Sequence, residues 1–311
     1  MKVQVDHLKR FFGSTRAVDD VSFGFDSGQI FGFVGPNGAG KTTTMRILAT
    51  LDEPTAGNAY INGRSVVEEP EAARRLIGFM PDHLPTHRDI SVHEYLDFFA
   101  RAYGIHSPRR QHVIEGIEQF TNLMGIRRKM LTALSKGMKQ RVSLARALIH
   151  DPPVLIMDEP AAGLDPRARV ELRELLKALA SQGKAILISS HILTELAEIC
   201  DGAVFIEQGR ILRAGMLNEF SATEKEESQR TVVIRSLGGA EALHRAMLQM
   251  PGVHDVRIAG QAVEADIEGT EETCCDLLAR LIGDGFKVCE FRQRQADLEQ
   301  VFMDITTGEV Q

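Results

Sequence analysis

Hydrophobic positions along the first 220 residues follow two different periods. Val3–Leu8 and Val21–Phe25 alternate apolar with polar residues, which is typical of strands in a half-exposed sheet. Val154–Met157 and Ala185–Ile188 are apolar at every position, the pattern of strands that are buried on both faces. Helical segments alternate with these strands, so we predict an α/β fold with a largely parallel central sheet.

Between residues 90 and 150 the helical period dominates. Apolar residues at helical spacing predict three helices, at Val92–Tyr103, Arg109–Met124 and Met138–Ile149. We expect these helices to form a helical insertion, residues 90–150, within an α/β domain that spans residues 1–220.

Residues 221–229 are polar and charged, which is typical of a linker. Beyond them, signals for strand, helix, strand, strand, helix and strand follow in that order, at Thr231–Arg235, Ala240–Met250, Val253–Ile258, Ala262–Ile267, Glu271–Ile282 and Lys287–Phe291. This order predicts a small α+β accessory domain of the ferredoxin-like, split β-α-β type at residues 230–311.

Charge and composition limit the possible functions. Residues 221–311 carry 17 acidic and 9 basic side chains, whereas residues 1–220 carry 26 acidic and 27 basic ones, and neither part has the basic stripe of a nucleic-acid-binding protein. No apolar run approaches the roughly 18 residues that span a bilayer, and the N-terminus alternates unlike a signal peptide. The four cysteines show no C-x-x-C spacing, so neither disulfides nor a zinc site is predicted. We expect a soluble, cytoplasmic protein.

One segment indicates the substrate class. Residues 35–42 read G-P-N-G-A-G-K-T and match G-x-x-x-x-G-K-[ST], between a strand-like run, Gln29–Val34, and a helix-like run, Thr43–Ala49. Such a loop turns successive N–H groups inward at a helix N-terminus and forms a nest for phosphate oxygens. Lys41 would reach the β- and γ-phosphates, and the Thr42 or Thr43 hydroxyl would hold Mg²⁺. The flanking elements favour a nucleoside triphosphate site over a glycine-rich surface turn, but kinases, GTPases, helicases and transport ATPases stay open.

Two buried strands end in chemically active residues. Val154–Met157 runs into Asp158 and Glu159, and Ala185–Ile188 is followed by Ser-Ser-His191. The carboxyl ends of parallel strands meet at one edge of a sheet, where α/β proteins build their sites. There Asp158 would hold Mg²⁺ through water, and Glu159 would polarise or deprotonate the attacking water.

A further segment, Leu134–Met138, precedes a helix. Ser135 is a good N-cap, and Gly137 would let an anion approach the backbone. From these residues alone the segment is either an ordinary helix start or a second anion site.

Taken in their order along the chain, these segments resemble the ATP-binding cassette (ABC) ATPases. The resemblance covers about residues 2–220 and rests on five motifs: the phosphate loop, the signature Leu134–Met138, the Asp158–Glu159 strand end, Ala162–Asp165 and the switch residue His191. It implies a phosphate-loop NTPase core of the ABC type that binds ATP with Mg²⁺ and hydrolyses ATP.

The resemblance also implies a shared site. In the ABC family two cassettes pair head to tail, and each ATP lies between the phosphate loop of one copy and the signature helix of the other. In a homodimer of this chain Ser135 and Gly137 would donate to the γ-phosphate, and Asp165 would cross the interface. His191 would contact the γ-phosphate as a sensor, and Phe12 would stack on adenine.

The expected site therefore draws on several segments. Its catalytic groups are Lys41, Glu159 and His191, and its metal ligands are Thr42, Asp82 and Asp158. The nucleotide-binding residues are Phe12, Gly35, Pro36, Asn37, Gly38, Ala39, Gly40, Lys41, Thr42, Thr43, Asp82, Ser135, Gly137, Asp165 and His191.

Three positions depart from the family pattern. The signature has Lys136 where glycine is usual and Met138 where glutamine is usual, but the Ser135 hydroxyl and the Gly137 N–H are both kept. Asp82 stands where the family usually has glutamine. Its carboxylate can still accept a hydrogen bond from Mg²⁺-bound water, but it adds negative charge and lacks a donor.

The resemblance extends to a class of cassette. Asp82–Gly104 and Ala296–Thr306 resemble cassettes that serve small export permeases on separate chains. We therefore expect an integral membrane permease as partner, docking near Asp82–Tyr95 and holding the chain on the inner face of the cell membrane. A soluble ABC ATPase acting on nucleic acid or ribosomes is the alternative, and a regulator without catalysis is a third possibility. The chain lacks the long coiled coils, zinc modules or second cassette of ABC ATPases that act on nucleic acid or ribosomes. It keeps the catalytic groups that a regulator without catalysis would have lost.

Overall fold

The computed structural model describes residues 2–84, 89–190, 192–220 and 229–293. These residues form two compact units that divide between Met216 and Leu217. Each unit has a hydrophobic core of its own. No helix within the described ranges is long and apolar enough to cross a bilayer.

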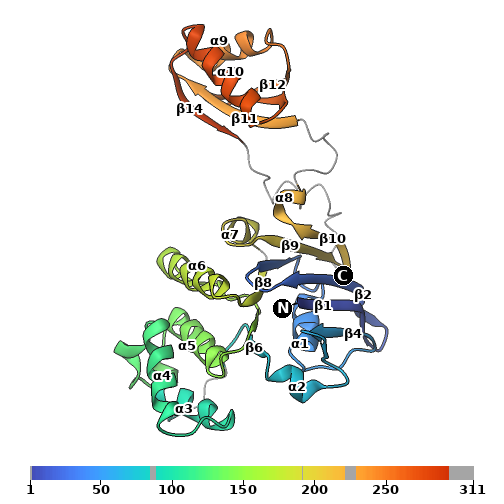
Figure 1. Ribbon diagram of the computed structural model, residues 1–311, viewed down its shortest axis with the longest axis vertical. Helices are drawn as coiled ribbons and strands as arrows, with labels where there is room; N and C mark the ends of the chain where they lie inside the picture. The colour runs from blue at the N-terminus through green and yellow to red at the C-terminus, as the bar shows by residue number, and fades with distance from the viewer. Residues whose placement is uncertain (1, 85–88, 191, 221–228, 294–311) are drawn as a thin grey trace. The chain divides into compact units, whose positions relative to one another are not determined.

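The first unit is built on a six-stranded sheet with the order β10-β9-β3-β8-β7-β6 (Figure 1). All neighbours are parallel except β10, which runs antiparallel to β9. Strands β7 and β8 are buried at every position, as their continuous apolar runs predict. The strands are β3 (Ile30–Val34), β6 (Ile77–Met80), β7 (Val154–Met157), β8 (Ala185–Ser190), β9 (Gly202–Glu207) and β10 (Arg210–Met216). The predicted α/β fold with a largely parallel sheet is confirmed.

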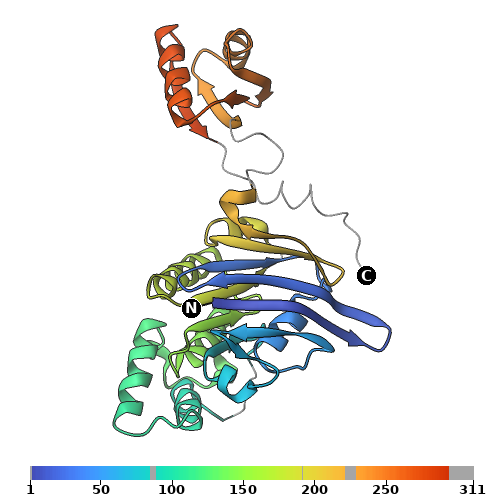
Figure 2. The same cartoon turned by 45° about the vertical axis from the view of Figure 1, so that its right-hand side comes forward.

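A second, antiparallel sheet has the order β2-β1-β4-β5. Its strands are β1 (Lys2–Phe12), β2 (Thr15–Asp26), β4 (Ala56–Ile61) and β5 (Arg64–Ser65). The long β1–β2 hairpin appears as the two dark blue strands of Figure 2. Alternate residues of this hairpin are buried, so one face of the sheet is free to join the core of the central sheet.

Helices surround the central sheet. They are α1 (Lys41–Leu48), α2 (Pro70–Arg74), α6 (Pro166–Ser181) and α7 (Leu193–Ala197). Met45 and Leu48 of α1 share one core cluster with Val5 of the second sheet and Val204 of the central sheet. Helix α1, which follows the phosphate loop in the chain, therefore packs in one core with both sheets.

The three helices predicted between residues 90 and 150 are confirmed and form a helical insertion (green in Figure 1). They are α3 (Val92–Ala102), α4 (Arg109–Phe120) and α5 (Lys136–Leu148), with 3₁₀ turns η1 (Met124–Ile126) and η2 (Leu131–Ala133) between the last two. The insertion has its own apolar cluster. Among the described residues of the insertion, Glu118 is the one buried carboxylate, and it lies beside this cluster. It is 2.7 Å from His93 Nδ1 and 3.1 Å from Arg127 Nε.

The second unit begins with α8 (Leu217–Phe220) and contains an antiparallel sheet with the order β12-β13-β11-β14. Its elements are β11 (Gln229–Ser236), α9 (Ala240–Met247), β12 (Val253–Ala259), β13 (Ala262–Glu268), α10 (Glu271–Gly283) and β14 (Val288–Gln293). Their sequence is that of a split β-α-β unit. The predicted linker lies outside the described residues except for Gln229, which begins β11, so its role stays a prediction.

Candidate active site

The order of the central strands brings the predicted site segments to one edge of the sheet. Strand β8 lies between β3 and β7, with Val34 paired to Ser190 and Met157 paired to Ile188. The phosphate loop follows β3, the Asp158–Glu159 pair follows β7, and Asp82 comes shortly after β6 on the far side of β7. His191 follows Ser190 in the chain but lies outside the described residues.

Glycines shape the phosphate loop because the backbone requires them. Gly38 and Gly40 have φ angles of 83° and 102°, a region that residues with a side chain rarely adopt. A Cβ on Gly35 would come within 2.2 Å of the Ile206 carbonyl oxygen. Helix α1 begins at Lys41, two residues earlier than the helix predicted from Thr43, so its first turn lies within the loop motif.

Lys41 lies over this loop. The side chain is buried, and Nζ donates hydrogen bonds to the carbonyls of Gly35 at 2.7 Å and Pro36 at 3.1 Å. Burial lowers the pKa of Lys41, and the charges of Glu159 and Asp158 oppose that shift. The ammonium group of Lys41 therefore interacts electrostatically with both carboxylates, which links the phosphate loop to the end of β7.

The three threonines after Lys41 differ in their surroundings. Thr44 is buried, and its hydroxyl donates to the Gly40 carbonyl at 2.9 Å. Thr42 is exposed in the first turn of α1, and Thr43 is half-buried. The Thr44 hydroxyl therefore serves the helix, which leaves Thr42 and Thr43 as the hydroxyls that the sequence assigns to nucleotide and metal.

The Asp158–Glu159 pair is held by a residue that sequence reasoning missed. Ser189 of β8 donates its hydroxyl proton to Asp158 Oδ1 at 2.7 Å and accepts the Glu159 N–H at 2.8 Å. Asp158 and Ser189 are both buried, and the Asp158 N–H donates to the Met80 carbonyl of β6 at 2.8 Å. One hydroxyl thus fixes the side chain of the first acid and the backbone of the second.

Glu159 has an unusual backbone conformation. Its φ angle is 48°, in the left-handed region, which costs free energy for a residue that is neither glycine nor asparagine. Strained residues of this kind cluster at functional sites, where the surrounding structure holds them. The hydrogen bond from the Glu159 N–H to Ser189 is one such constraint.

The donor set fits Mg²⁺ in kind but not in number. A threonine hydroxyl and carboxylates supply the oxygen ligands that Mg²⁺ prefers. No group of three or more His, Cys, Asp or Glu within the described ranges could hold a metal ion. The predicted ligands Thr42, Asp82 and Asp158 therefore do not form a complete metal site by themselves, and phosphate oxygens and water would have to complete the coordination of Mg²⁺.

Asp82 connects the site to the signature helix. Its side chain is half-exposed, with Oδ1 3.1 Å from His83 Nδ1. Its backbone carbonyl accepts from Gln140 Nε2 of α5 at 3.5 Å. Nearby, Arg146 of α5 donates to the Phe79 carbonyl at 2.9 Å. The end of β6 is therefore bound to α5 within one chain.

Ser135 and Asp165 both act as helix N-caps. Ser135 Oγ accepts the Met138 N–H at 3.3 Å at the start of α5, and Asp165 Oδ1 accepts the Ala168 N–H at 2.8 Å at the start of α6. Gly137, in the first turn of α5, packs towards Ala168 of α6. The contacts of these residues with a second copy stay predictions.

Phe12 ends β1 and is 48% exposed, whereas Phe11 is half-buried. The Arg10 guanidinium lies 4.5 Å from the centre of the Phe12 ring. Exposure favours Phe12 over Phe11 as the ring that stacks on adenine, the choice made from the sequence.

Comparisons with known proteins show which family this chain resembles. The model of the family described as "ABC transporter" matches residues 18–162, and a model described as "AAA domain, putative AbiEii toxin, Type IV TA system" matches residues 130–197. The Nod factor export ATP-binding protein I of Paraburkholderia xenovorans (strain LB400) is 33% identical over 309 residues, which cover 99% of this chain and 98% of that protein. The linearmycin resistance ATP-binding protein LnrL of Bacillus subtilis (strain 168) is 28% identical over 308 residues, 98% of each chain.

Solved structures of ABC cassettes cover 69% to 71% of this chain. One ATP-binding subunit of an ABC transporter superposes with a TM-score of 0.65 at 31% identity and covers 71% of this chain and 92% of its own. A dimeric cassette bound to ADP and Pi superposes with a TM-score of 0.64 at 24% identity, over 69% of this chain and 98% of its own, and supports the fold alone. The chain therefore belongs to the ABC transporter family and is one of its ATP-hydrolysing subunits.

Proposed function

We propose that this chain drives an export system, in which two copies pair head to tail around two ATP molecules and act on a separate membrane permease. The observation that carries the proposal is the carboxylate pair held by Ser189 beside Lys41, since this arrangement suits hydrolysis and not mere nucleotide binding. The relatives that match along their whole length are named for export and for resistance.

Within the site each group has a distinct role. The phosphate loop and Lys41 bind the β- and γ-phosphates, as the buried ammonium over the loop supports. Thr42 and Asp158 hold Mg²⁺, which neutralises phosphate charge when it is bound. Glu159 polarises the attacking water, and His191 contacts the γ-phosphate.

The second half of each site comes from the partner copy. Ser135 is the N-cap of α5. The N–H groups in the first turn of this helix, including that of Gly137, lie at the positive end of the helix dipole, where an anion is favoured. In this proposal they bind the γ-phosphate held by the other copy. Asp165, an exposed cap of α6, lies at the interface.

Coupling to the permease runs through Asp82. The Gln140 and Arg146 contacts bind the end of β6 to α5, so a shift at the nucleotide is passed to the helical insertion. The permease docks near Asp82–Tyr95, of which residues 85–88 lie outside the described residues, and holds the chain at the inner face of the membrane. The described residues show no feature that supports action on nucleic acid or ribosomes.

The test is reconstitution with the membrane protein encoded beside this chain. We expect the two proteins to co-purify, and the permease to raise ATP turnover in proteoliposomes. The Glu159→Gln variant should co-purify equally well without the turnover. A chain that neither binds this membrane protein nor responds to it would contradict the proposal.

A further inference from the structure

The turn between β9 and β10, residues 208–209, lies directly against the phosphate loop. The Gly209 N–H donates to the Ala39 carbonyl at 3.0 Å. A Cβ on Gly40 would come within 2.3 Å of the Ala17 carbonyl oxygen and 3.5 Å of Gly209 Cα. The loop, the turn and β2 thus approach one another through backbone atoms, so a shift of the turn reaches the loop directly.

The same turn is bound to β2. The Gly209 carbonyl accepts the Asp19 N–H at 2.7 Å. Gly209 has a φ angle of 78°, and a Cβ there would lie 2.9 Å from the Arg16 carbonyl oxygen and 3.0 Å from that of Ala17. Through its two backbone groups Gly209 therefore links β2 to the phosphate loop.

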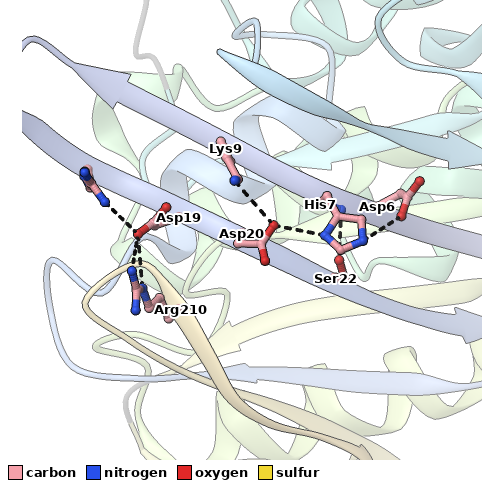
Figure 3. A network of polar contacts seen from close by, with 8 residues as sticks. Asp6, His7, Lys9, Asp19, Asp20, Ser22 and Arg210 are labelled. Carbon is pink, nitrogen blue, oxygen red and sulfur yellow. Dashed lines mark hydrogen bonds and ion pairs between the residues drawn. The ribbon is translucent and has the colours of Figure 1, made fainter.

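An ion pair between two side chains supports this link between β2 and the phosphate loop. Asp19 is only 7% exposed, and its Oδ2 accepts from Arg210 at 2.7 Å (Nη2) and 3.1 Å (Nε) (Figure 3). The same oxygen accepts from Arg16 Nη1 at 3.5 Å. The hydrogen bond from Arg210 is the main cause that lowers the pKa of Asp19, so the carboxylate is charged at neutral pH. Since Arg210 directly follows Gly209, the pair anchors the turn one residue away from the atoms that contact the loop.

The neighbouring carboxylate has a different environment. Asp20 Oδ1 lies 3.0 Å from His7 Nδ1 and 3.7 Å from Lys9 Nζ, both on β1 (Figure 3). These contacts stay within the β1–β2 hairpin. Asp20 thus offers a matched control for Asp19, with the same charge and strand and with contacts to another element.

From these contacts we propose that Asp19 and Arg210 are positioning residues of the phosphate loop, which they hold in its nucleotide-binding shape through the Gly209 turn. Neither side chain needs to touch the nucleotide. The proposal rests on the proposed function only in taking residues 35–42 as the nucleotide site, and it deepens that assignment with two residues from other parts of the chain.

The test measures ADP binding to the full-length chain in the presence of Mg²⁺ by calorimetry. Asp19→Asn keeps the size of the side chain and removes its charge, and Arg210→Met keeps the apolar stem and removes the donors. We expect each variant to raise the Kd for ADP about tenfold, because a displaced loop loses several phosphate contacts at once. The Asp20→Asn control should stay within about twofold of the parent chain.

Two further readouts separate positioning from general stability. The Asp19→Asn/Arg210→Met double variant should bind ADP no more weakly than either single variant, since both remove one interaction. Arg210→Met leaves the buried Asp19 carboxylate without its main partner, so we expect a lower thermal unfolding midpoint for the nucleotide-free chain than Asp20→Asn has; the ADP affinities of Asp19→Asn and Arg210→Met should nevertheless not follow the order of their midpoints. If Asp19→Asn fails to fold, Arg210→Met decides by the same criterion.

An ADP affinity of Arg210→Met within about twofold of that of Asp20→Asn would overturn the proposal. So would a loss of affinity that merely follows a loss of thermal stability across the variants. Failure of the export proposal looks different, because it would leave ADP binding by the parent chain intact and remove only its response to the permease.

Discussion

The Ser189 hydroxyl donates a 2.7 Å hydrogen bond to Asp158 Oδ1 and accepts the backbone N–H of the next residue, Glu159. This relationship joins β8 to the end of β7, its parallel neighbour. It fixes one carboxylate for a metal ion and sets the backbone from which the other carboxylate extends.

Ser189→Ala should therefore impair hydrolysis more than binding. We expect ATP turnover to fall about tenfold, the lower end of what the loss of a supporting hydrogen bond costs at a metal site. The affinity for ADP without Mg²⁺ should be unchanged. Ser143→Ala is the matched control, because that buried hydroxyl has no hydrogen-bond partner among the described residues. Equal turnover in both variants would show that Ser189 does not position the site.

Glu159→Gln tests the role of this residue in activating water. The amide keeps the size of the side chain but cannot accept a proton from water, so turnover should fall at least about 100-fold while ATP binding is retained. Glu174→Gln, an exposed change on α6, should have little effect on either quantity. Unchanged turnover in Glu159→Gln would move the base elsewhere.

The buried environment of His150 leads us to expect that folding stability depends on pH. Its ring stacks on Tyr103 with 4.0 Å between centroids, and Nε2 contacts the Ile77 carbonyl at 3.0 Å. Burial lowers the pKa of His150 below its ordinary 6.5, although the Ile77 carbonyl and Asp151 oppose the shift. The unfolded chain therefore binds a proton first, and folding stability should fall as the pH drops below about 6.5 towards the folded-state pKa.

The measurement is the loss of thermal stability between about pH 7.5 and about pH 5.5. His150→Gln should lose less than the parent chain, since its side chain cannot take up the proton. His106→Gln, an exposed change in the same region, should lose as much as the parent chain. An identical loss in all three proteins would exclude His150 as a source of the effect.

The burial of Glu118 leads us to expect that the folding stability of the helical insertion depends on this carboxylate. This carboxylate is fully buried on α4, against His93 of α3 and Arg127 beyond η1. Removing it with Glu118→Ala leaves a cation without its partner and should lower the free energy of unfolding by about 3 kcal/mol. Glu115→Ala, exposed on the same helix, should cost far less in the same chemical denaturation experiment.

Most of the site could be read from the sequence because its parts are local. The loop glycines, Lys41, Asp158 and Glu159 each lie next to a strand or helix whose pattern is strong, and the parallel sheet then places them at one edge. The caps at Ser135 and Asp165 are likewise short-range signals, and Asp165 is followed by the proline typical of a first helical turn.

The residues that were missed act over long sequence separations. Ser189 looks like any small residue in a buried strand until the pairing of β7 with β8 is known. Asp19 and Arg210 are 191 positions apart, and no local pattern links them. The helical insertion is predictable in extent, but the buried Glu118 on its apolar face is not, since a helical period gives no sign of a charged partner.

The dependence of ATP turnover on chain concentration tests the shared site most directly. If Ser135 and Gly137 of one copy complete the phosphate loop of the other, turnover per chain must rise with concentration as dimers form, and Ser135→Ala must lower the plateau. Turnover per chain that stays constant from dilute to concentrated protein would contradict a site built from two copies.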